Sequence, residues 1–231
     1  DVSVYKKYTK RFIKNFLYDF LAEKIGKKLP YGSLTGVRPT KLYYELSEKI
    51  DNPYEYLIDE FHVEPARAKI VRDCVKNQKG YKNSSDENVA LFVNIPFCPT
   101  RCSYCSFIST EIGRVKKQIP LYTESLVEEI ELSKELVKRA KKKVTSIYVG
   151  GGTPPALGAE YLDKVLSPLK EYNVEFTVEA GRPDVITDEI TDVLLRNNVT
   201  RVSVNPQTFK QSTLDLIGRK HTVEDIYTAY D

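Results

Sequence analysis

Residues 91–107 read LFVNIPFCPTRCSYCSF, and this stretch decides how the rest of the chain is interpreted. A short apolar segment leads into three of the four cysteines, Cys98, Cys102 and Cys105, at a Cys-x3-Cys-x2-Cys spacing. No fourth ligand lies nearby in the sequence. Three closely spaced thiolates suit a metal centre that keeps one coordination position open, and an open position indicates chemistry.

The composition indicates a soluble globular protein. The 231 residues are 41% hydrophobic and 29% charged, and no run of about 18 apolar residues is present that could span a bilayer. The net charge of +3 is small, and Lys and Arg are scattered among Asp and Glu rather than gathered in one stripe, which argues against a nucleic-acid partner. The start at Asp1 does not resemble a signal peptide, and the four cysteines do not resemble a disulfide framework. We therefore expect a reducing, cytoplasmic location.

Four helices are predicted in residues 1–80, which we expect to form a small helical domain. Apolar residues recur every three or four positions between residues 4 and 25, and Gly26 ends this amphipathic helix. Prolines predict the starts of three further helices, at Pro39, Pro53 and Pro65. Cys74, on the last helix, is expected to be a buried apolar filler. The polar residues 81–88 are typical of a linker.

The pattern changes after the linker, where strand-like and helix-like segments alternate through residues 89–231. The predicted strands are residues 90–96, 145–149, 174–179 and 200–204, and the predicted helices are residues 118–141, 158–171, 187–197 and 211–229. Such alternation predicts a parallel α/β sheet with crossover helices, either doubly wound or part of a barrel. Four units cannot close an eight-unit barrel of about 250 residues, so we expect an open sheet.

Polar groups follow each predicted strand, at the edge where active sites of such folds lie. The cysteines follow the first strand. Residues 150–155, GGGTPP, follow the second, and this backbone is expected to approach a ligand closely and to donate free N–H groups. The third strand ends at Glu179, and the fourth leads into residues 205–208, with residues 218–221 beyond them. We expect these segments to converge on one edge of the sheet.

Each of these features has a simpler explanation. The cysteines are compatible with a partial zinc site completed by His221 or a carboxylate, but structural zinc sites usually show paired knuckles, which favours iron–sulfur chemistry. The glycine run matches neither the phosphate-binding P-loop nor the GxGxxG fingerprint. Its position directly after a predicted strand is therefore the main evidence that it belongs to a site. Glu179 could pair with a lysine, Gln207 could cap a helix, and Arg219 could lie on a solvated surface. Tyr104 has nowhere regular to pack, which favours a place beside a cofactor.

Taken together, these motifs resemble a known family. The cysteine run with Tyr104, then GGGTPP, a strand ending in Glu179, RVSVNPQTF and LIGRKH are similar to the radical S-adenosylmethionine (SAM) enzymes of the oxygen-independent coproporphyrinogen III oxidase (dehydrogenase) family. The segment YGSLTGVRPTKL and the NPQT version of the fourth strand resemble the HemZ type. The resemblance covers nearly the whole chain and implies that residues 89–231 form the N-terminal part of a radical SAM partial (β/α)6 barrel.

The resemblance implies a cofactor set and a role for each matching residue. Cys98, Cys102 and Cys105 would hold a [4Fe–4S] cluster whose fourth iron binds SAM. The residues that would contact SAM fall into three groups: Gly151, Gly152 and Thr153 at its methionine end, Glu179 and Gln207 at its polar groups including the ribose, and Arg219 as a cation for a carboxylate. The backbone around Tyr104 would face the adenine.

The sequence also departs from the family pattern. Characterised oxidases often carry a cysteine two positions after the last ligand, where this chain has Phe107, and a tyrosine that helps to anchor SAM is replaced by Phe92. The Cys-x-Phe pattern is typical of the related haem-chaperone branch. The family barrel has six units and a further C-terminal domain, so a chain that ends after the fourth unit is expected to be a fragment that is inactive alone.

Three functions therefore remain in consideration. The first is radical decarboxylation of coproporphyrinogen III propionates to vinyl groups in haem biosynthesis, with a porphyrinogen substrate and an electron donor as partners. The second is haem binding and delivery without turnover. The third is a structural metal module, which predicts bound zinc and no iron–sulfur absorbance.

Overall fold

The computed structural model describes residues 2–34, 38–80 and 85–231, with side chains in the first helix described at Lys6 and from Thr9 onward. Two units are present, Asp1–Lys82 and Asn83–Asp231, and each is considered by itself. Residues 35–37 of the HemZ-type segment lie outside the described residues. No described helix is long and apolar enough to cross a membrane.

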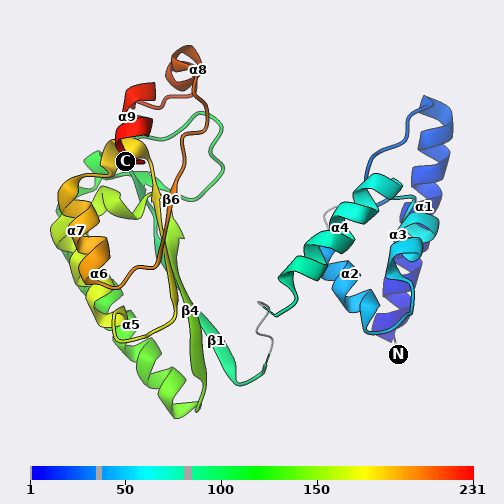
Figure 1. The fold of residues 1–231 in the computed structure, drawn as a ribbon, viewed down its shortest axis with the longest axis horizontal. Helices are drawn as coiled ribbons and strands as arrows, with labels where there is room; N and C mark the ends of the chain where they lie inside the picture. The colour runs from blue at the N-terminus through cyan, green and yellow to red at the C-terminus, as the bar shows by residue number, and fades with distance from the viewer. Residues whose placement is uncertain (1, 35–37, 81–84) are drawn as a thin grey trace. The chain divides into compact units, whose positions relative to one another are not determined.

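The first unit contains the four predicted helices (Figure 1): α1 (Val2–Ile25), α2 (Pro39–Ser47), α3 (Pro53–Phe61) and α4 (Pro65–Gln78). A proline stands in the first turn of α2, α3 and α4, where its missing N–H is not needed. Leu57, Val63 and Ala68 are fully buried at the centre of this unit. Cys74 is exposed on α4, so the expectation that it fills the core is wrong.

Helix α1 is amphipathic as predicted, but its polar side is the side that packs. Arg11 donates a hydrogen bond to the Tyr56 hydroxyl (2.8 Å), and Asn15 donates one to the Glu60 carbonyl (2.6 Å). The Tyr18 ring stacks on His62, whose Nε2 lies 3.2 Å from the Asp19 carboxylate. Seven large apolar side chains of α1 stay exposed: Phe12, Ile13, Phe16, Leu17, Phe20, Leu21 and Ile25. Polar contacts thus attach α1 to its unit and leave its apolar side uncovered.

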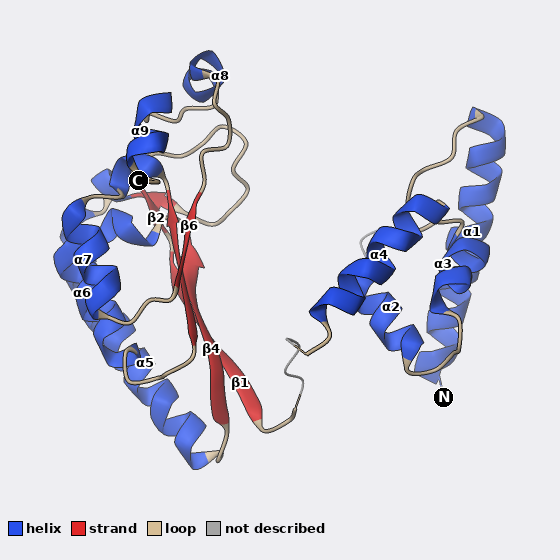
Figure 2. Ribbon diagram, in the orientation of Figure 1, coloured by secondary structure: helices blue, strands red, loops and turns tan. Residues whose placement is uncertain are grey.

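The second unit is built on a parallel sheet in the order β1-β4-β5-β6. Its strands are β1 (Asn88–Ile95), β4 (Lys143–Gly151), β5 (Glu175–Gly181) and β6 (Arg201–Val204). Its longer helices, α5 (Ile119–Arg139), α6 (Ala159–Leu166) and α7 (Asp188–Arg196), lie along the same face of the sheet (Figure 2). A sequential strand order with helices on one face is the winding of a barrel, not of a doubly wound sheet.

The fold prediction is therefore confirmed: an open, four-stranded α/β sheet with the winding of a partial barrel. Residues of β4 alternate as expected, with Ile147 and Val149 buried against the helices and Tyr148 exposed on the other face. Eighteen buried apolar side chains make up the core, and burying each contributes roughly 1.5–3 kcal/mol. This core gives the strand ends a rigid foundation.

Two features around the carboxyl ends of the strands were not predicted. The short strands β2 (Phe97–Cys98) and β3 (Thr110–Glu111) pair in parallel. This pairing holds together the two ends of the loop that carries Cys102 and Cys105. The predicted helix over residues 211–229 is instead two helices, α8 (Gln211–Leu216) and α9 (Val223–Thr228). The break between them includes Gly218, whose φ of +75° belongs to the left-handed region.

Several short 3-10 turns complete this unit: Ile112–Arg114, Lys116–Gln118, Pro154–Leu157, Ser167–Leu169 and Pro183–Val185. Two of them, Pro154–Leu157 and Pro183–Val185, directly follow β4 and β5. They end the strands sharply, because the ring of a proline fixes φ and its nitrogen cannot donate to a neighbouring strand.

Candidate cluster and cofactor site

A cavity of about 160 Å³ lies at the carboxyl ends of the strands and collects the residues that the sequence singled out. All ten line it: Cys98, Cys102, Tyr104, Cys105, Gly151, Gly152, Thr153, Glu179, Gln207 and Arg219. They come from five segments spread over more than a hundred residues. The structure brings these segments together at one edge of the sheet, as expected.

The cysteine loop is anchored to the segment that follows α8. The Ser103 N–H donates to the Ile217 carbonyl (3.0 Å), and the Cys105 N–H donates to the Cys102 carbonyl (3.0 Å). All three cysteines of the loop are free thiols of intermediate exposure. The thiols thus lie on an ordered loop and remain accessible from the cavity.

The donor chemistry of this loop fits an iron–sulfur cluster. Among the residues that the structure describes, no three His, Cys, Asp or Glu side chains are grouped to hold one metal ion. An iron–sulfur cluster binds each thiolate through a separate iron, so its ligands surround a larger object. The Thr153 hydroxyl lies 3.6 Å from the Cys98 sulfur, where it can donate to a thiolate.

The glycine loop differs from expectation in one respect. The Gly152 N–H donates to the Ile95 carbonyl (2.9 Å) and the Thr153 N–H to the Phe97 carbonyl (2.7 Å), so neither amide is free for a ligand. A Cβ on Gly152 would lie 2.5 Å from the Phe97 carbonyl oxygen, and one on Gly151 would lie 2.2 Å from Asn94 Oδ1. The glycines are therefore needed for close packing of β4 against β1 and β2, and what the loop offers a ligand is the Thr153 side chain.

Glu179 accepts a hydrogen bond from a tyrosine and is not the partner of a lysine among the described residues. The Tyr148 hydroxyl donates to Glu179 Oε1, and this bond, with burial, raises the pKa of Tyr148 to about 12. Tyr148 is in register with Phe92, and the two rings stack with centroids 6.0 Å apart. A tyrosine thus stands on the strand beside Phe92, although its hydroxyl is committed to Glu179.

Arg219 is buried, which rules out the solvated position considered from sequence. It is 6% exposed, and its Nη1 donates to the Asn205 carbonyl (2.6 Å). Its buried Nε has no hydrogen-bond partner among the described residues. Burial raises the pKa of Tyr104, and the Arg219 cation opposes that shift. A guanidinium held in place at the lining of the cavity is suited to a carboxylate ligand.

Gln207 has a strained backbone and no capping role in the structure. Its φ is +66°, in the left-handed region that non-glycine residues rarely occupy. The side chain is exposed and lines the cavity, and the next helix, α8, begins only at Gln211. Strain of this kind is often found at binding sites, where the surrounding structure enforces it.

The structure adds an arginine that the sequence analysis missed. Arg182 is 2% exposed and makes two hydrogen bonds to the Asp184 carboxylate, of 2.9 and 2.8 Å. It also donates to the Thr100 hydroxyl (2.5 Å), and Thr100 in turn donates to the Gly218 carbonyl (3.1 Å). Arg182 therefore connects the end of β5 to the cysteine loop. The signal in the sequence was the pair of opposite charges in Arg182-Pro183-Asp184, which directly follows the end of β5 at Gly181.

His221 is buried beside this network. It is 1% exposed, both ring nitrogens lack a partner in the described part of the chain, and Nδ1 is 3.9 Å from Asp184 Oδ1. Burial lowers the pKa of His221, and the Arg219 cation lowers it further, whereas Asp184 acts in the opposite direction. The imidazole is therefore neutral in the folded protein near neutral pH.

This buried histidine predicts a dependence of stability on pH. The unfolded chain binds a proton at His221 below about pH 6.5, and the folded chain resists it, so the free energy of unfolding should fall on acidification by up to about 1.4 kcal/mol per pH unit. Urea unfolding between pH 7.5 and 5 measures this slope. His221→Gln should flatten it. An unchanged slope in His221→Gln would contradict this role.

Comparison with known proteins identifies the family. A model of the radical SAM superfamily matches residues 93–231, which is more than half of the chain. The chain belongs to the radical SAM superfamily. The oxygen-independent coproporphyrinogen-III oxidase-like protein HemZ of Bacillus subtilis is 34% identical over 213 residues, which cover 87% of this chain and 42% of HemZ. The haem chaperone HemW of Lactococcus lactis is 37% identical over 147 residues, 62% of this chain and 36% of HemW.

A solved radical SAM structure supports the fold. Coproporphyrinogen III oxidase (HemN) of Escherichia coli superposes with a TM-score of 0.55 at 24% identity, over 68% of this chain and 36% of HemN. The chain spans less than half the length of each of these relatives. Members of the radical SAM superfamily use a [4Fe–4S] cluster and SAM, and three free thiols beside an arginine and a carboxylate fit that pair of cofactors.

Proposed function

We propose that this chain is the cofactor-binding part of a radical SAM enzyme that decarboxylates coproporphyrinogen III propionates to vinyl groups in haem biosynthesis. The observation that carries the proposal is that three thiols, Glu179 and Arg219 line one and the same cavity. Similarity to the HemZ and HemN proteins supports the choice of a porphyrinogen substrate. A cluster with an exposed iron needs an electron donor and a reducing compartment, so we place the protein in the cytoplasm.

Each cavity residue has a role in this proposal. Cys98, Cys102 and Cys105 would ligate three irons of the cluster. Arg219 would offer its guanidinium, which lines the cavity, to a carboxylate of SAM, and Glu179 would accept hydrogen bonds from its hydroxyl or ammonium groups. The remaining cavity residues would line SAM: Tyr104, Gly151, Gly152, Thr153 and Gln207. When bound, the two cofactors would supply the radical chemistry that acts on a propionate, with an external donor as the source of the electron.

Haem binding without turnover is the second candidate. It is favoured by the 37% identity to the HemW chaperone and by Phe107 after the last cysteine, the pattern of that branch. Phe107 is 66% exposed and lines the cavity, so nothing in the described residues blocks access to the cysteine loop at this point. The two candidates share the cysteine site and differ in the fate of the tetrapyrrole.

The test is made on the full-length protein that contains this chain, after anaerobic reconstitution with iron and sulfide. The decarboxylase proposal expects vinyl-bearing porphyrin and 5'-deoxyadenosine by mass spectrometry. A stoichiometric haem spectrum without decarboxylated product would select the chaperone instead. Zinc without iron by elemental analysis would reject both and leave a structural metal module.

Gln207→Gly should separate backbone strain from cofactor binding. Glycine accepts the φ of +66° without penalty, so the free energy of unfolding should rise by about 0.5 kcal/mol. Loss of the amide should weaken SAM binding about tenfold, the value of one hydrogen bond. Lys141→Gly, at φ +54° and outside the cavity, is the control: it should stabilise the chain and leave SAM affinity unchanged. Unchanged SAM affinity in Gln207→Gly would remove Gln207 from the site.

A further inference from the structure

A second cavity, of about 350 Å³, lies within the first unit between α1, α2 and the end of α3. Its walls are of two kinds. The apolar part is formed by Leu34, Leu42 and Phe61, and the polar base by Asn15 and Ser33, joined by a hydrogen bond of 2.6 Å. The charged rim consists of Lys10, Arg11, Lys14, Arg38, Lys41 and Glu45. Five cations therefore surround one carboxylate.

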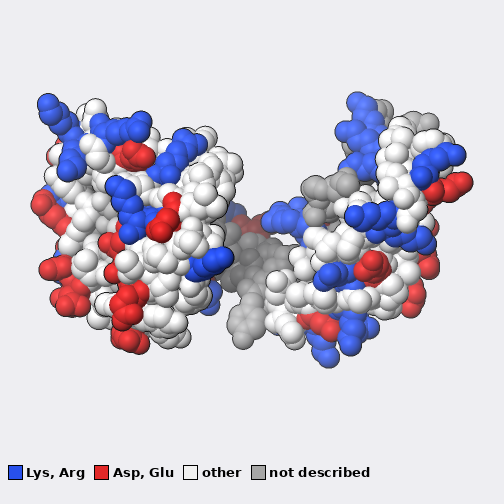
Figure 3. All heavy atoms as spheres, turned by 90° about the horizontal axis from the view of Figure 1, so that it is seen from above, with Lys and Arg blue, Asp and Glu red and all other residues white. Residues whose placement is uncertain are grey.

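Positive charge is concentrated in this unit and is not spread evenly over the chain. Residues 1–82 carry 17 Lys and Arg against 11 Asp and Glu, a net charge of +6, whereas residues 83–231 carry 18 against 21, a net charge of −3. Figure 3 shows Lys and Arg side chains over this unit. The small net charge of the whole chain conceals this difference, which is of the kind that concentrates anions at a surface.

The rim cations are only partly neutralised. Glu45, the single acid of the cavity, lies 3.8 Å from Lys41. No carboxylate of the described residues forms an ion pair with Lys10, Arg11 or Arg38. Because a lysine or arginine on a solvated surface needs no partner, these charges alone would not define a site. The arrangement of Arg11 does.

Arg11 is held in place before any ligand arrives. Its Nη1 donates to the Tyr56 hydroxyl (2.8 Å), and its guanidinium lies over the Phe61 ring, 4.7 Å from the centroid. These contacts fix one face and one nitrogen of the group and leave its other N–H groups unassigned among the described residues. A fixed guanidinium loses little entropy when it binds an oxyanion.

We propose that this cavity binds a small ligand that carries an oxyanion on an apolar body. The oxyanion meets Arg11 and Arg38, and the apolar body lies on Leu34, Leu42 and Phe61. The cavity volume is within the range of small-molecule sites, about 300–1,000 Å³. The oxyanion is a carboxylate or a phosphate, since both accept paired N–H groups from arginine. This site is formed within the first unit and does not depend on the cluster or on the proposed function.

Isothermal titration calorimetry of the full-length protein tests the proposal with three ligands: AMP, laurate and inorganic phosphate. AMP or laurate should bind at least tenfold more tightly than inorganic phosphate, because only they reach the apolar wall. Tighter binding of AMP assigns a phosphate ligand, and tighter binding of laurate assigns a carboxylate. Failure of both to bind, or equal affinity for inorganic phosphate, overturns the proposal.

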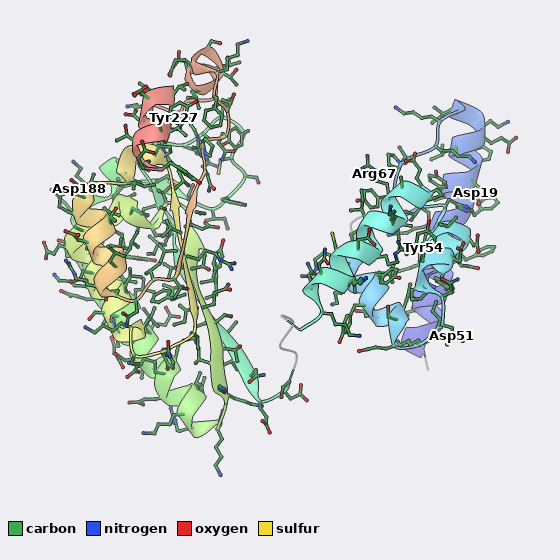
Figure 4. All side chains as sticks on the ribbon, viewed as in Figure 1. Asp19, Asp51, Tyr54, Arg67, Asp188 and Tyr227 are labelled. Carbon is green, nitrogen blue, oxygen red and sulfur yellow. The ribbon has the colours of Figure 1, made fainter. Side chains whose placement is uncertain are left out.

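Two variants locate the binding. Arg38→Gln removes a cation from the rim and should weaken binding about tenfold. Arg67→Gln removes the same charge from α4 in the same unit (Figure 4) but outside the cavity, and should change the affinity less than twofold. An equal loss in both variants would show a general charge effect and reject the site. Arg38 is exposed, so its loss should not unfold the unit, and circular dichroism of both variants checks this.

Discussion

Replacing Cys102 by alanine is expected to reduce the iron that the reconstituted protein retains from about four atoms per chain to near zero. With two thiolates left, a cubane cluster loses one iron ligand beside a position that is already open, and such clusters are labile. The Cys102 loop is fixed by β2 and β3 and by the Ser103–Ile217 hydrogen bond, so no neighbouring cysteine can move in to replace it. Iron analysis and the visible absorbance of the protein measure the effect.

Cys74→Ala is the matched control for this experiment. Cys74 is an exposed free thiol on α4 in the other unit and lines none of the cavities described above. Its replacement should leave iron content and absorbance unchanged. If Cys102→Ala kept its iron, or if Cys74→Ala lost it to the same degree, the cluster would not be held by the loop at residues 98–105.

Arg182→Met is expected to lower the free energy of unfolding by about 3 kcal/mol, because it removes two charge-assisted hydrogen bonds to Asp184 and one hydrogen bond to Thr100. Methionine fills a similar volume and removes the guanidinium, which is 2% exposed and hydrogen-bonded to Asp184 and Thr100. At roughly 2–4 °C per kcal/mol, the melting temperature should fall by roughly 6–12 °C. Thermal unfolding followed by far-UV circular dichroism measures it.

Arg196→Met tests whether burial is the reason. Arg196 also pairs with an aspartate, Asp163, at 3.0 Å, but its side chain is 54% exposed. Loss of such a surface pair should cost about 0–1 kcal/mol. Because Arg182 also holds Thr100 in the cysteine loop, Arg182→Met should release iron faster than Arg196→Met under the same chelator. Similar stability and similar iron release in the two variants would refute a positioning role for Arg182.

Much of the second unit could be predicted from sequence, because its signals are local. Apolar runs such as residues 90–96 mark buried parallel strands, and the amphipathic segments between them mark the crossover helices. Once the strands are parallel, their carboxyl ends meet at one edge. That rule alone brings Cys98, Thr153, Glu179 and Gln207 together without any knowledge of distances.

The features that escaped prediction depend on long-range contacts. The pairing of β2 with β3 involves two residues in each strand, too few to leave a periodic pattern. The amides of Gly152 and Thr153 are taken by carbonyls of β1 and β2, which a glycine run by itself cannot indicate. Neither Arg182 nor His221 carries a sequence signal for burial, because their burial depends on segments around residues 100 and 218 that pack against them.

Helix α1 shows a related limit of hydrophobic periodicity. The pattern correctly identifies which side of the helix is apolar, but it does not say what covers that side. In the structure, Arg11, Asn15 and Tyr18 supply the attachment and the apolar side faces outward. The orientation of this helix within its unit follows from these polar and ring contacts and not from its apolar pattern.

The uncovered side of α1 has a consequence for how this protein behaves in a test tube. The first unit has a net charge of +6, so the first units of two copies repel each other. In dilute buffer this repulsion keeps the exposed apolar sides of their α1 helices apart. Salt shortens the reach of that repulsion from about 10 Å at 0.1 M to about 3 Å at 1 M. Concentrated salt is usually added to prevent protein aggregation. For this protein it should instead lower the solubility, and low-salt buffers are the better choice.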